Sequence, residues 1–285
     1  MEVRRLMVVG AGRMGSGIAQ VAAEAGISVL LCDTGQQFVD RGLAAIGRFL
    51  KGSVDRGKTT PDAMAAALAR IEGTLQPERA VECDFVIEAV TEDLAIKERV
   101  FRALDAFAPA GTVLASNTSS LPITQLAAFT GRPEKVIGMH FMNPVPLMKL
   151  IEVIRGLATD EETVSRTMAF AAALGKTPVE VGDSPGFVVN RLLMPLINEA
   201  TYCVYEGVAK AEAVDQVMRL GANHPMGPLA LGDLVGLDVA LSILDVLYTE
   251  FKDPKYRACP LLRQMVRAGR LGRKSGRGFY DYAKA

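Results

Sequence analysis

Histidine and cysteine are scarce in this chain of 285 residues. It has two histidines and four cysteines (Cys32, Cys83, Cys203 and Cys259), with no CxxC pair and no histidine next to a cysteine. These spacings match no familiar metal-ligand pattern, so we expect no metal site. Reduced thiols, as in cytosolic proteins, are the expected state of the four cysteines.

The chain also lacks an excess of charge of either sign. Lysine plus arginine and aspartate plus glutamate both number 32, which gives a formal net charge of zero. This balance removes the usual electrostatic argument for a nucleic-acid or anionic-membrane partner, and we expect neither. A local basic patch for a phosphorylated small molecule remains compatible with it.

Long apolar runs are missing as well. None approaches the roughly 18 residues that span a bilayer. We expect no signal or transit peptide before the first strand, because Arg4–Arg5 leads straight into apolar residues and a glycine turn. The sequence therefore predicts a soluble, cytoplasmic protein.

The first half of the chain alternates short apolar runs with helical stretches, a pattern typical of a parallel α/β sheet. The predicted strands are Leu6–Val9, Val29–Cys32, Phe85–Val90, Val113–Ala115, Val136–Met139, Leu150–Ile154 and Val179–Val181. The predicted helices are Ser16–Ala25, Phe38–Leu50, Pro61–Ile71, Leu94–Phe107 and Glu161–Leu174. The second and third of these helices are expected to form a protruding hairpin around a polar turn.

From Gly186 onward only helical periodicity is left. We therefore expect an α/β protein with two domains, a Rossmann-type dinucleotide-binding domain over 1–184 and a smaller all-helical domain over 185–285. The junction Gly182–Gly186 has the glycine and proline content of a hinge.

A glycine turn follows the first predicted strand and opens the first predicted helix. Its sequence is GAGRMG, from Gly10 to Gly15. A lone GxGxxG is weak, but here a strand precedes it, a helix follows it, and an acid ends the next strand. Gly10 permits the tight turn, Gly12 lets the backbone approach a pyrophosphate, and Gly15 lets the helix pack closely on the strand. Arg13 and Met14 complete the predicted cofactor turn, where a helix N-terminus favours phosphates.

Asp33 is the acid, and it lies 18 positions after Gly15. Its carboxylate is placed to accept hydrogen bonds from the adenosine ribose, which favours NAD over NADP. No arginine follows within seven residues to receive a 2′-phosphate. The alternatives are that the turn binds FAD in place of NAD, or that it binds no dinucleotide.

His140 and Glu152 are the candidate chemical pair. His140 lies near the carboxyl end of a predicted strand, where open α/β sheets bind ligands. Glu152 stands in the apolar run 150–154, where an unpaired carboxylate is costly. A carboxylate beside His140 would orient the ring and make the neutral imidazole a better general base. The alternative is a core histidine and an exposed glutamate.

Five motifs carry a resemblance to the 3-hydroxyacyl-CoA dehydrogenase family over essentially the whole chain. They are Ser116–Leu121 (SNTSSL), Gly138–Pro144 (GMHFMNP), Pro185–Arg191 (PGFVVNR), Asn223–Pro228 (NHPMGP) and Gly272–Tyr280 (GRKSGRGFY). The sequence is most similar to the short bacterial 3-hydroxybutyryl-CoA dehydrogenases within that family.

The resemblance implies roles for individual residues. His140 would take the proton from the 3-hydroxyl as hydride leaves C3, with Glu152 as its partner. Ser119 would hydrogen-bond the substrate oxygen, and Asn190 would hold the substrate and the site geometry. The positions that would line the NAD site are Glu92, Lys97, Asn117, Asn143 and Lys274.

Several of these positions also have a purely structural interpretation. Ser119 and Asn117 suit a turn and a helix cap, and Asn190 suits the start of a helix. In the hairpin, Lys51, Arg56 and Lys58 are the expected contacts of the CoA phosphates, with a solvated charge cluster as the alternative. The family often has a lysine where this chain has Gly52.

The resemblance thus implies an NAD-dependent (S)-3-hydroxyacyl-CoA dehydrogenase that interconverts 3-hydroxybutyryl-CoA and acetoacetyl-CoA. A relative acting on another 3-hydroxy acid, such as a sugar acid or a dicarboxylyl-CoA, is one alternative. A non-catalytic NAD-binding protein is another. The apolar stretch Leu229–Leu247 exceeds what a small domain needs for its own core, and predicts a homodimer.

Overall fold

The computed structural model describes residues 3–283 of the chain. These residues divide into two compact units, one ending at Ser184 and the other beginning at Pro185.

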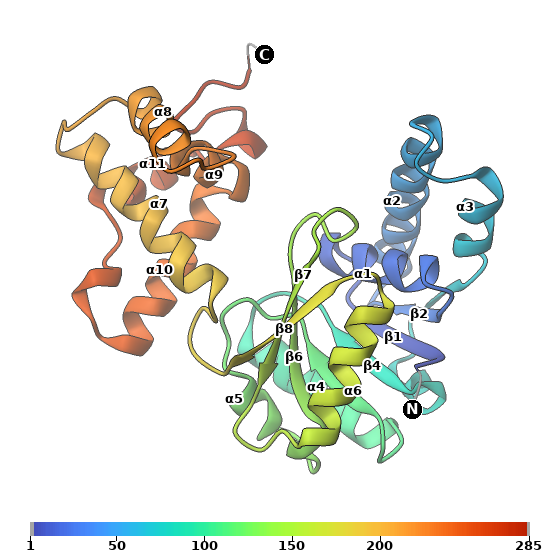
Figure 1. Ribbon diagram of the computed structural model, residues 1–285. Helices are drawn as coiled ribbons and strands as arrows, with labels where there is room; N and C mark the ends of the chain where they lie inside the picture. Colours follow the sequence, from blue (N-terminus) through green and yellow to red (C-terminus); the bar gives the residue numbers. More distant parts are fainter. Residues whose placement is uncertain (1–2, 284–285) are drawn as a thin grey trace. The chain divides into compact units, whose positions relative to one another are not determined.

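The first unit is built on a single eight-stranded sheet with the order β3-β2-β1-β4-β5-β6-β7-β8 (Figure 1). Neighbouring strands are parallel except for the antiparallel pair β6–β7. The strands are β1 (Arg5–Val9), β2 (Ser28–Cys32), β3 (Ile71–Thr74), β4 (Phe85–Glu88), β5 (Val113–Ser116), β6 (Val136–Phe141), β7 (Leu150–Arg155) and β8 (Thr177–Gly182). The strand order reverses between β1 and β4, because β2 and β3 extend the sheet on one side of β1 and β4 to β8 extend it on the other. Rossmann-type sheets bind ligands at such a switch point, at the carboxyl ends of the strands. The predicted fold class is confirmed.

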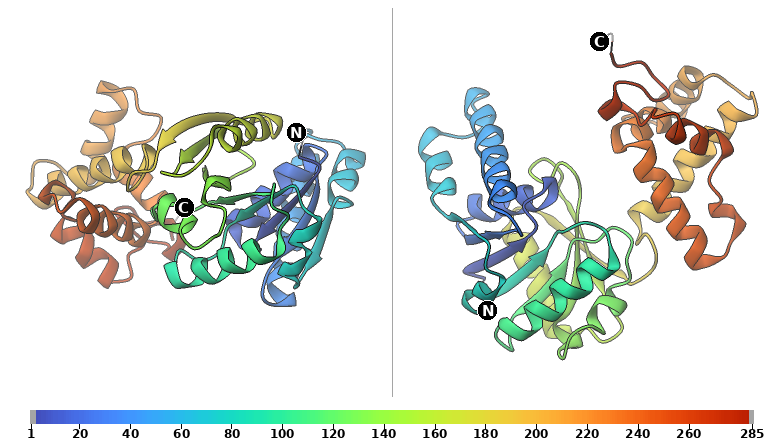
Figure 2. Two further views of the ribbon diagram at one scale, coloured as in Figure 1. Left: turned by 90° about the horizontal axis from the view of Figure 1, so that it is seen from below. Right: turned by 180° about the vertical axis from the view of Figure 1, so that it is seen from behind.

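Helices cover both faces of this sheet. They are α1 (Arg13–Glu24), α2 (Gln36–Asp55), α3 (Pro61–Leu68), α4 (Leu94–Phe107), α5 (Ile123–Ala127) and α6 (Glu161–Ala173), with short 3-10 turns η1 (Pro77–Glu82) and η2 (Pro133–Lys135). Ile18 of α1 and Phe170 of α6 share one hydrophobic cluster with alternate strand residues such as Val8 and Ile87. α4 lies on the face opposite α6 (Figure 2).

α2 and α3 lie side by side and project from the sheet (Figures 1 and 2). α2 runs to Asp55, so Lys51 lies on this helix, which the sequence predicted to end at Leu50. The predicted third helix is also too long, because Ile71 begins strand β3. A Cβ atom at Gly73 would lie 2.4 Å from Val39 Cγ1, so glycine is required where α2 packs on this edge strand.

The second unit is helical. Its elements are α7 (Val189–Tyr205), α8 (Ala211–Gly221), α9 (Pro228–Val235), α10 (Leu237–Phe251) and α11 (Pro260–Arg267), with 3-10 turns η3 (Pro254–Tyr256) and η4 (Arg273–Ser275). Its core joins α7, α10 and α11 through buried residues such as Ile197, Leu244 and Leu262. The stretch Leu229–Leu247 supplies much of this core, so its length is a weaker argument for an interface than the sequence suggested.

Two buried carboxylates hold the end of the chain on the second unit. Asp233 accepts hydrogen bonds from the N–H groups of Phe279 and Tyr280, both at 3.0 Å. Asp215 accepts one from the Tyr280 hydroxyl at 2.7 Å. A Cβ atom at Gly278 would lie 1.9 Å from Asp233 Oδ1, so the glycine lets the chain lie against this carboxylate. No helix formed by residues 3–283 is long and apolar enough to cross a membrane.

Candidate active site

The glycine turn between β1 and α1 has the geometry of a phosphate-binding loop. Gly10 has a φ of +105°, and a Cβ atom there would lie 2.5 Å from the Ala89 carbonyl oxygen. A Cβ atom at Gly15 would lie 1.7 Å from the Gly10 carbonyl oxygen. Nothing lies within 4 Å of the position that a Cβ would take on Gly12. The turn is therefore closed by Gly10 and Gly15 and open above Gly12, where a pyrophosphate approaches the backbone.

Helix α1 begins at Arg13, three residues earlier than the sequence predicted. Its N-cap, Gly12, supplies no side-chain hydrogen bond to the first turn. Arg13 is exposed and Met14 is half-buried. The unused N–H groups and the helix dipole suit an anion, so the turn fits the dinucleotide predicted for it.

Asp33 follows β2 beside this turn. Its Oδ2 atom accepts a hydrogen bond from the Ala11 N–H at 2.7 Å, and its Oδ1 atom accepts one from the Thr34 N–H at 2.7 Å. A carboxylate oxygen can accept more than one hydrogen bond. The side chain is thus oriented at the turn and can still accept from ribose hydroxyls.

His140 and Glu152 face each other across β6 and β7. They are register partners in the antiparallel pair, and His140 Nδ1 lies 2.8 Å from Glu152 Oε2. His140 is 7% exposed and Glu152 is 1% exposed. The alternative of a core histidine with an exposed glutamate is therefore wrong. The carboxylate fixes the ring through Nδ1, and Nε2 is the remaining ring nitrogen for acid–base chemistry.

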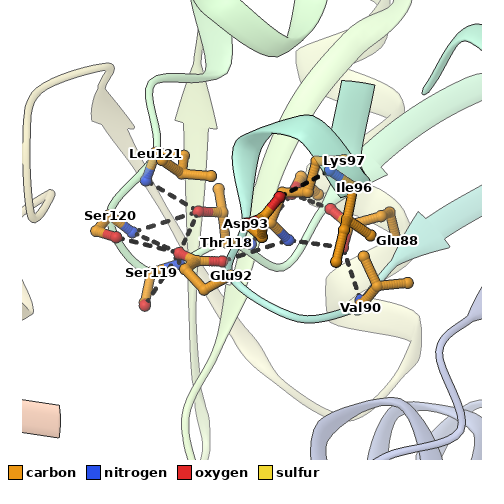
Figure 3. Close-up of polar contacts among 11 residues, drawn as sticks. Glu88, Val90, Glu92, Asp93, Ile96, Lys97, Thr118, Ser119, Ser120 and Leu121 are labelled. Atoms are coloured by element: carbon orange, nitrogen blue, oxygen red, sulfur yellow. Dashed lines mark hydrogen bonds and ion pairs between the residues drawn. The ribbon is translucent and has the colours of Figure 1, made fainter. Parts of the chain in front are cut away.

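Glu92 organises the loop after β5 that carries Ser119 (Figure 3). Its Oε1 atom accepts hydrogen bonds from Thr118 Oγ1 at 2.5 Å, the Ser119 N–H at 2.8 Å and the Ser120 N–H at 3.1 Å. The hydroxyls of Ser119 and Ser120 lie 3.3 and 3.1 Å from the same oxygen. Burial raises the pKa of Glu92, but Lys97 and the donors of this loop outweigh it and hold the pKa below its usual value.

Lys97, in the first turn of α4, is only 1% exposed. Its Nζ atom donates to Glu88 Oε1 at 2.6 Å and lies 3.3 Å from Glu92 Oε2. The ammonium group thus joins two carboxylates and is shielded from solvent. Glu88 was missed by the sequence analysis, although an acid that ends the apolar strand FVIE is the same signal that drew attention to Glu152.

The other predicted NAD-site residues of this unit lie at strand ends. Asn117 follows β5, and its Oδ1 atom accepts a hydrogen bond from the Phe141 N–H at 2.9 Å, which joins the ends of β5 and β6. Asn143 follows β6 and is exposed. Both lie at the carboxyl edge of the parallel strands.

The second unit holds the remaining predicted residues. Asn190 is the second residue of α7 and is 7% exposed. Lys274 lies on η4 and donates to Asp238 Oδ2 at 2.6 Å. The hairpin residues Lys51, Arg56 and Lys58 are exposed in the first unit.

The four cysteines are free thiols. Within residues 3–283, no group of three or more histidine, cysteine, aspartate or glutamate side chains is placed to hold a metal ion.

The sheet order, the open glycine turn and the His140–Glu152 pair define a Rossmann-type dinucleotide-binding protein with a buried acid–base pair. Two family models match the chain, "3-hydroxyacyl-CoA dehydrogenase, NAD binding domain" over residues 5–184 and "3-hydroxyacyl-CoA dehydrogenase, C-terminal domain" over residues 186–282. The chain belongs to the 3-hydroxyacyl-CoA dehydrogenase family, and NAD is its cofactor.

Full-length relatives support this assignment. The chain is 58% identical to a probable 3-hydroxybutyryl-CoA dehydrogenase of Bacillus subtilis, with 99% of this chain and 98% of the relative covered. It is 51% identical to the 3-hydroxybutyryl-CoA dehydrogenase of Clostridioides difficile, with 98% and 100% covered. The crystal structure of (S)-3-hydroxybutyryl-CoA dehydrogenase from Ralstonia eutropha matches with a TM-score of 0.95 and 48% identity, over 99% of both chains.

Proposed function

We propose that this protein interconverts (S)-3-hydroxybutyryl-CoA and acetoacetyl-CoA with NAD as the redox partner. The observation that carries this proposal is the buried His140–Glu152 pair at the carboxyl edge of the sheet. Oxidation of a secondary alcohol requires a base, and an imidazole whose orientation is fixed by a buried carboxylate is suited to that role.

Nε2 of His140 takes the proton from the 3-hydroxyl group of the substrate when the alcohol is oxidised, and returns it when the ketone is reduced. Glu152 holds the Nδ1 proton, keeps the ring in one orientation and stabilises the imidazolium that forms. When bound, NAD supplies the nicotinamide ring that exchanges hydride with C3 of the substrate. No metal is needed in this scheme, since the positive imidazolium balances the developing oxygen charge.

Ser119 and Asn190 hold the substrate in this scheme. The Ser119 hydroxyl hydrogen-bonds the C3 oxygen, from a loop whose backbone is fixed by Glu92. Asn190 holds the substrate from the start of α7. Reacting atoms must be held close together for hydride transfer, so these positioning contacts contribute to rate.

The CoA moiety is proposed to bind the exposed basic residues of the α2–α3 hairpin, Lys51, Arg56 and Lys58. The Arg56 guanidinium lies over Gly52, with Nη1 3.3 Å from the position that a Cβ would take there. Arg56 thus puts a positive charge next to the position where the family often has a lysine. Phosphates favour such a cluster of cations.

The further parts of the proposal concern assembly and location. We propose a cytoplasmic homodimer formed through the helical unit. Large apolar side chains are exposed there on α7 and α8, namely Leu192 at 69%, Val217 at 66% and Leu220 at 76%. Val217 and Leu220 lie one turn apart on the same helix, and contiguous exposed apolar surface often marks an interface between protein chains.

Initial rates of NADH oxidation test the proposed reaction. Acetoacetyl-CoA, longer 3-ketoacyl-CoA esters, a dicarboxylyl-CoA and free acetoacetate are compared at equal enzyme concentration. We expect the highest kcat/KM with acetoacetyl-CoA. If another compound gives a higher kcat/KM, that compound replaces acetoacetyl-CoA as the proposed substrate. NADH binding without turnover of any of these compounds would indicate a non-catalytic protein.

A further inference from the structure

Among the acids in residues 3–184, Glu88 is the most deeply buried, and the proposed reaction gives it no role. It is the last residue of β4 and is 0% exposed. Three donors surround its carboxylate, since Oε1 accepts from the Lys97 ammonium at 2.6 Å and the Val90 N–H at 2.7 Å, and Oε2 accepts from Ser116 Oγ at 2.6 Å. A buried ion pair is often no more stabilising than apolar residues of the same size. Stability alone therefore gives a weak reason for this arrangement.

Two paths of polar contacts lead from Glu88 to the loop that carries Ser119, and Figure 3 shows the one through Lys97 and Glu92. The first passes through Lys97 to Glu92, which accepts from the Ser119 N–H at 2.8 Å. The second passes through Ser116, whose Oγ atom accepts a hydrogen bond from the Thr118 N–H at 3.2 Å. Glu88 and Ser116 are register partners on β4 and β5, so the sheet itself sets the starting point of both paths.

We propose that Glu88 is a positioning residue for the reaction, acting through Lys97, Glu92 and Ser116 to fix the loop that presents Ser119. The inference rests on the proposed function for the role of Ser119. The charges agree with it, because Lys97 neutralises Glu88 and Glu92 remains an anion that gathers the donors of the loop. If Glu88 loses its charge, Glu92 is the one carboxylate left within 4 Å of the Lys97 ammonium among the described residues. The ammonium is then drawn towards Glu92 and away from its present position.

The variant Glu88→Gln tests this inference, because it keeps the shape of the side chain and removes its charge. We expect kcat/KM for acetoacetyl-CoA to fall about 100-fold, which is the order of loss that a displacement of about 1 Å causes. The Kd for NADH should rise by a smaller factor, because Lys97 and Glu92 are also predicted to line the NAD site. Glu98→Gln, on the solvent side of the same helix in a pair with Arg102, is the matched control and should keep wild-type kcat.

A double-mutant cycle separates positioning from general destabilisation. In a Ser119→Ala background, Glu88→Gln should lower kcat/KM by less than a further threefold, because the hydroxyl that Glu88 positions is already gone. An undiminished loss in that background would overturn the inference. If Glu88→Gln does not fold, Ser116→Ala is used in the same cycle, since it breaks one path without stranding a charge, and a loss of about tenfold that vanishes beside Ser119→Ala is expected.

Hydrogen exchange gives a readout that does not depend on activity. The N–H groups of Ser119 and Ser120 both donate to Glu92. Glu88→Gln or Ser116→Ala should therefore speed exchange in residues 118–121 at least tenfold, while Glu98→Gln leaves it unchanged. Unchanged exchange would refute the inference even if the protein proves to act on a different substrate. An inactive wild type with the expected exchange pattern would refute only the proposed function.

Discussion

Replacing Glu152 by glutamine tests the core of the proposed chemistry. In the unaltered protein, His140 Nδ1 lies 2.8 Å from the Glu152 carboxylate. Glutamine has nearly the same shape, and its carbonyl oxygen can still accept a hydrogen bond from this nitrogen. The ring therefore keeps its orientation, and only the charge that stabilises the imidazolium is removed. The substitution isolates charge from geometry.

The magnitude follows from the burial of the pair. Both side chains are shielded from solvent, with Glu152 1% exposed, so water compensates little for the lost charge. A hydrogen bond to a charged group contributes about 1.5–3 kcal/mol. Because about 1.4 kcal/mol corresponds to a factor of ten in rate, kcat should fall roughly 10- to 100-fold. Loss of the base itself in His140→Gln should cost about 10²- to 10⁴-fold.

The assay is the steady-state rate of NADH oxidation with acetoacetyl-CoA, together with the NADH Kd and the melting temperature. Glu152→Ala should be slower than Glu152→Gln, since it loses orientation as well as charge. The control is Glu180→Gln on the neighbouring strand β8, where the side chain is exposed and its loss should not change kcat. The reasoning is refuted if Glu152→Gln turns over like the control, or if its effect adds fully to that of His140→Gln.

Four further outcomes are expected. NADPH should give a much lower kcat/KM than NADH, and Asp33→Ala should narrow the difference; equal values for the unaltered protein would contradict the role of Asp33. Asn190→Ala should lower kcat/KM for acetoacetyl-CoA and leave NADH affinity unchanged, whereas a parallel loss of NADH affinity would place it in the cofactor site. Light scattering at micromolar concentration should give the mass of a dimer, and a monomer would remove the proposed interface. The Glu92 pKa lies below its ordinary value of 4.5, so Glu92 stabilises the fold at higher pH and this contribution disappears as pH falls through the folded-state pKa. The difference in unfolding free energy between the unaltered protein and Glu92→Gln should therefore shrink below about pH 4.5, and a difference that grows there would contradict the assignment.

Features that depend on a short stretch of chain were predictable from the sequence. The glycine turn and Asp33 are set by one strand, one turn and one helix, and the structure places them together. The start of α1 was misplaced by three residues because Gly12 and Gly15 are poor helix formers whose presence is explained by close approach of the backbone.

Features that depend on register were harder to predict. His140 and Glu152 were a candidate pair, but only the antiparallel register of β6 and β7 makes them direct partners. Strand β3 was hidden because the alanine-rich α3 precedes it and its glycine, Gly73, disfavours a strand on propensity alone. Lys97 was placed at the cofactor site by resemblance, and no local pattern shows that its ammonium is buried between two carboxylates.

The segment that joins the two units shows how such long-range contacts refine a local prediction. The sequence predicted a hinge over Gly182–Gly186. The Asp183 carboxylate, however, accepts hydrogen bonds from the N–H groups of Ile123 at 3.0 Å and Thr124 at 2.7 Å, at the start of α5. Asp183 is thereby fixed to the first unit, and α5 follows the loop of Ser119 almost directly. A hinge motion at this junction must therefore leave Asp183 in place on the first unit, and the hinge itself stays a prediction.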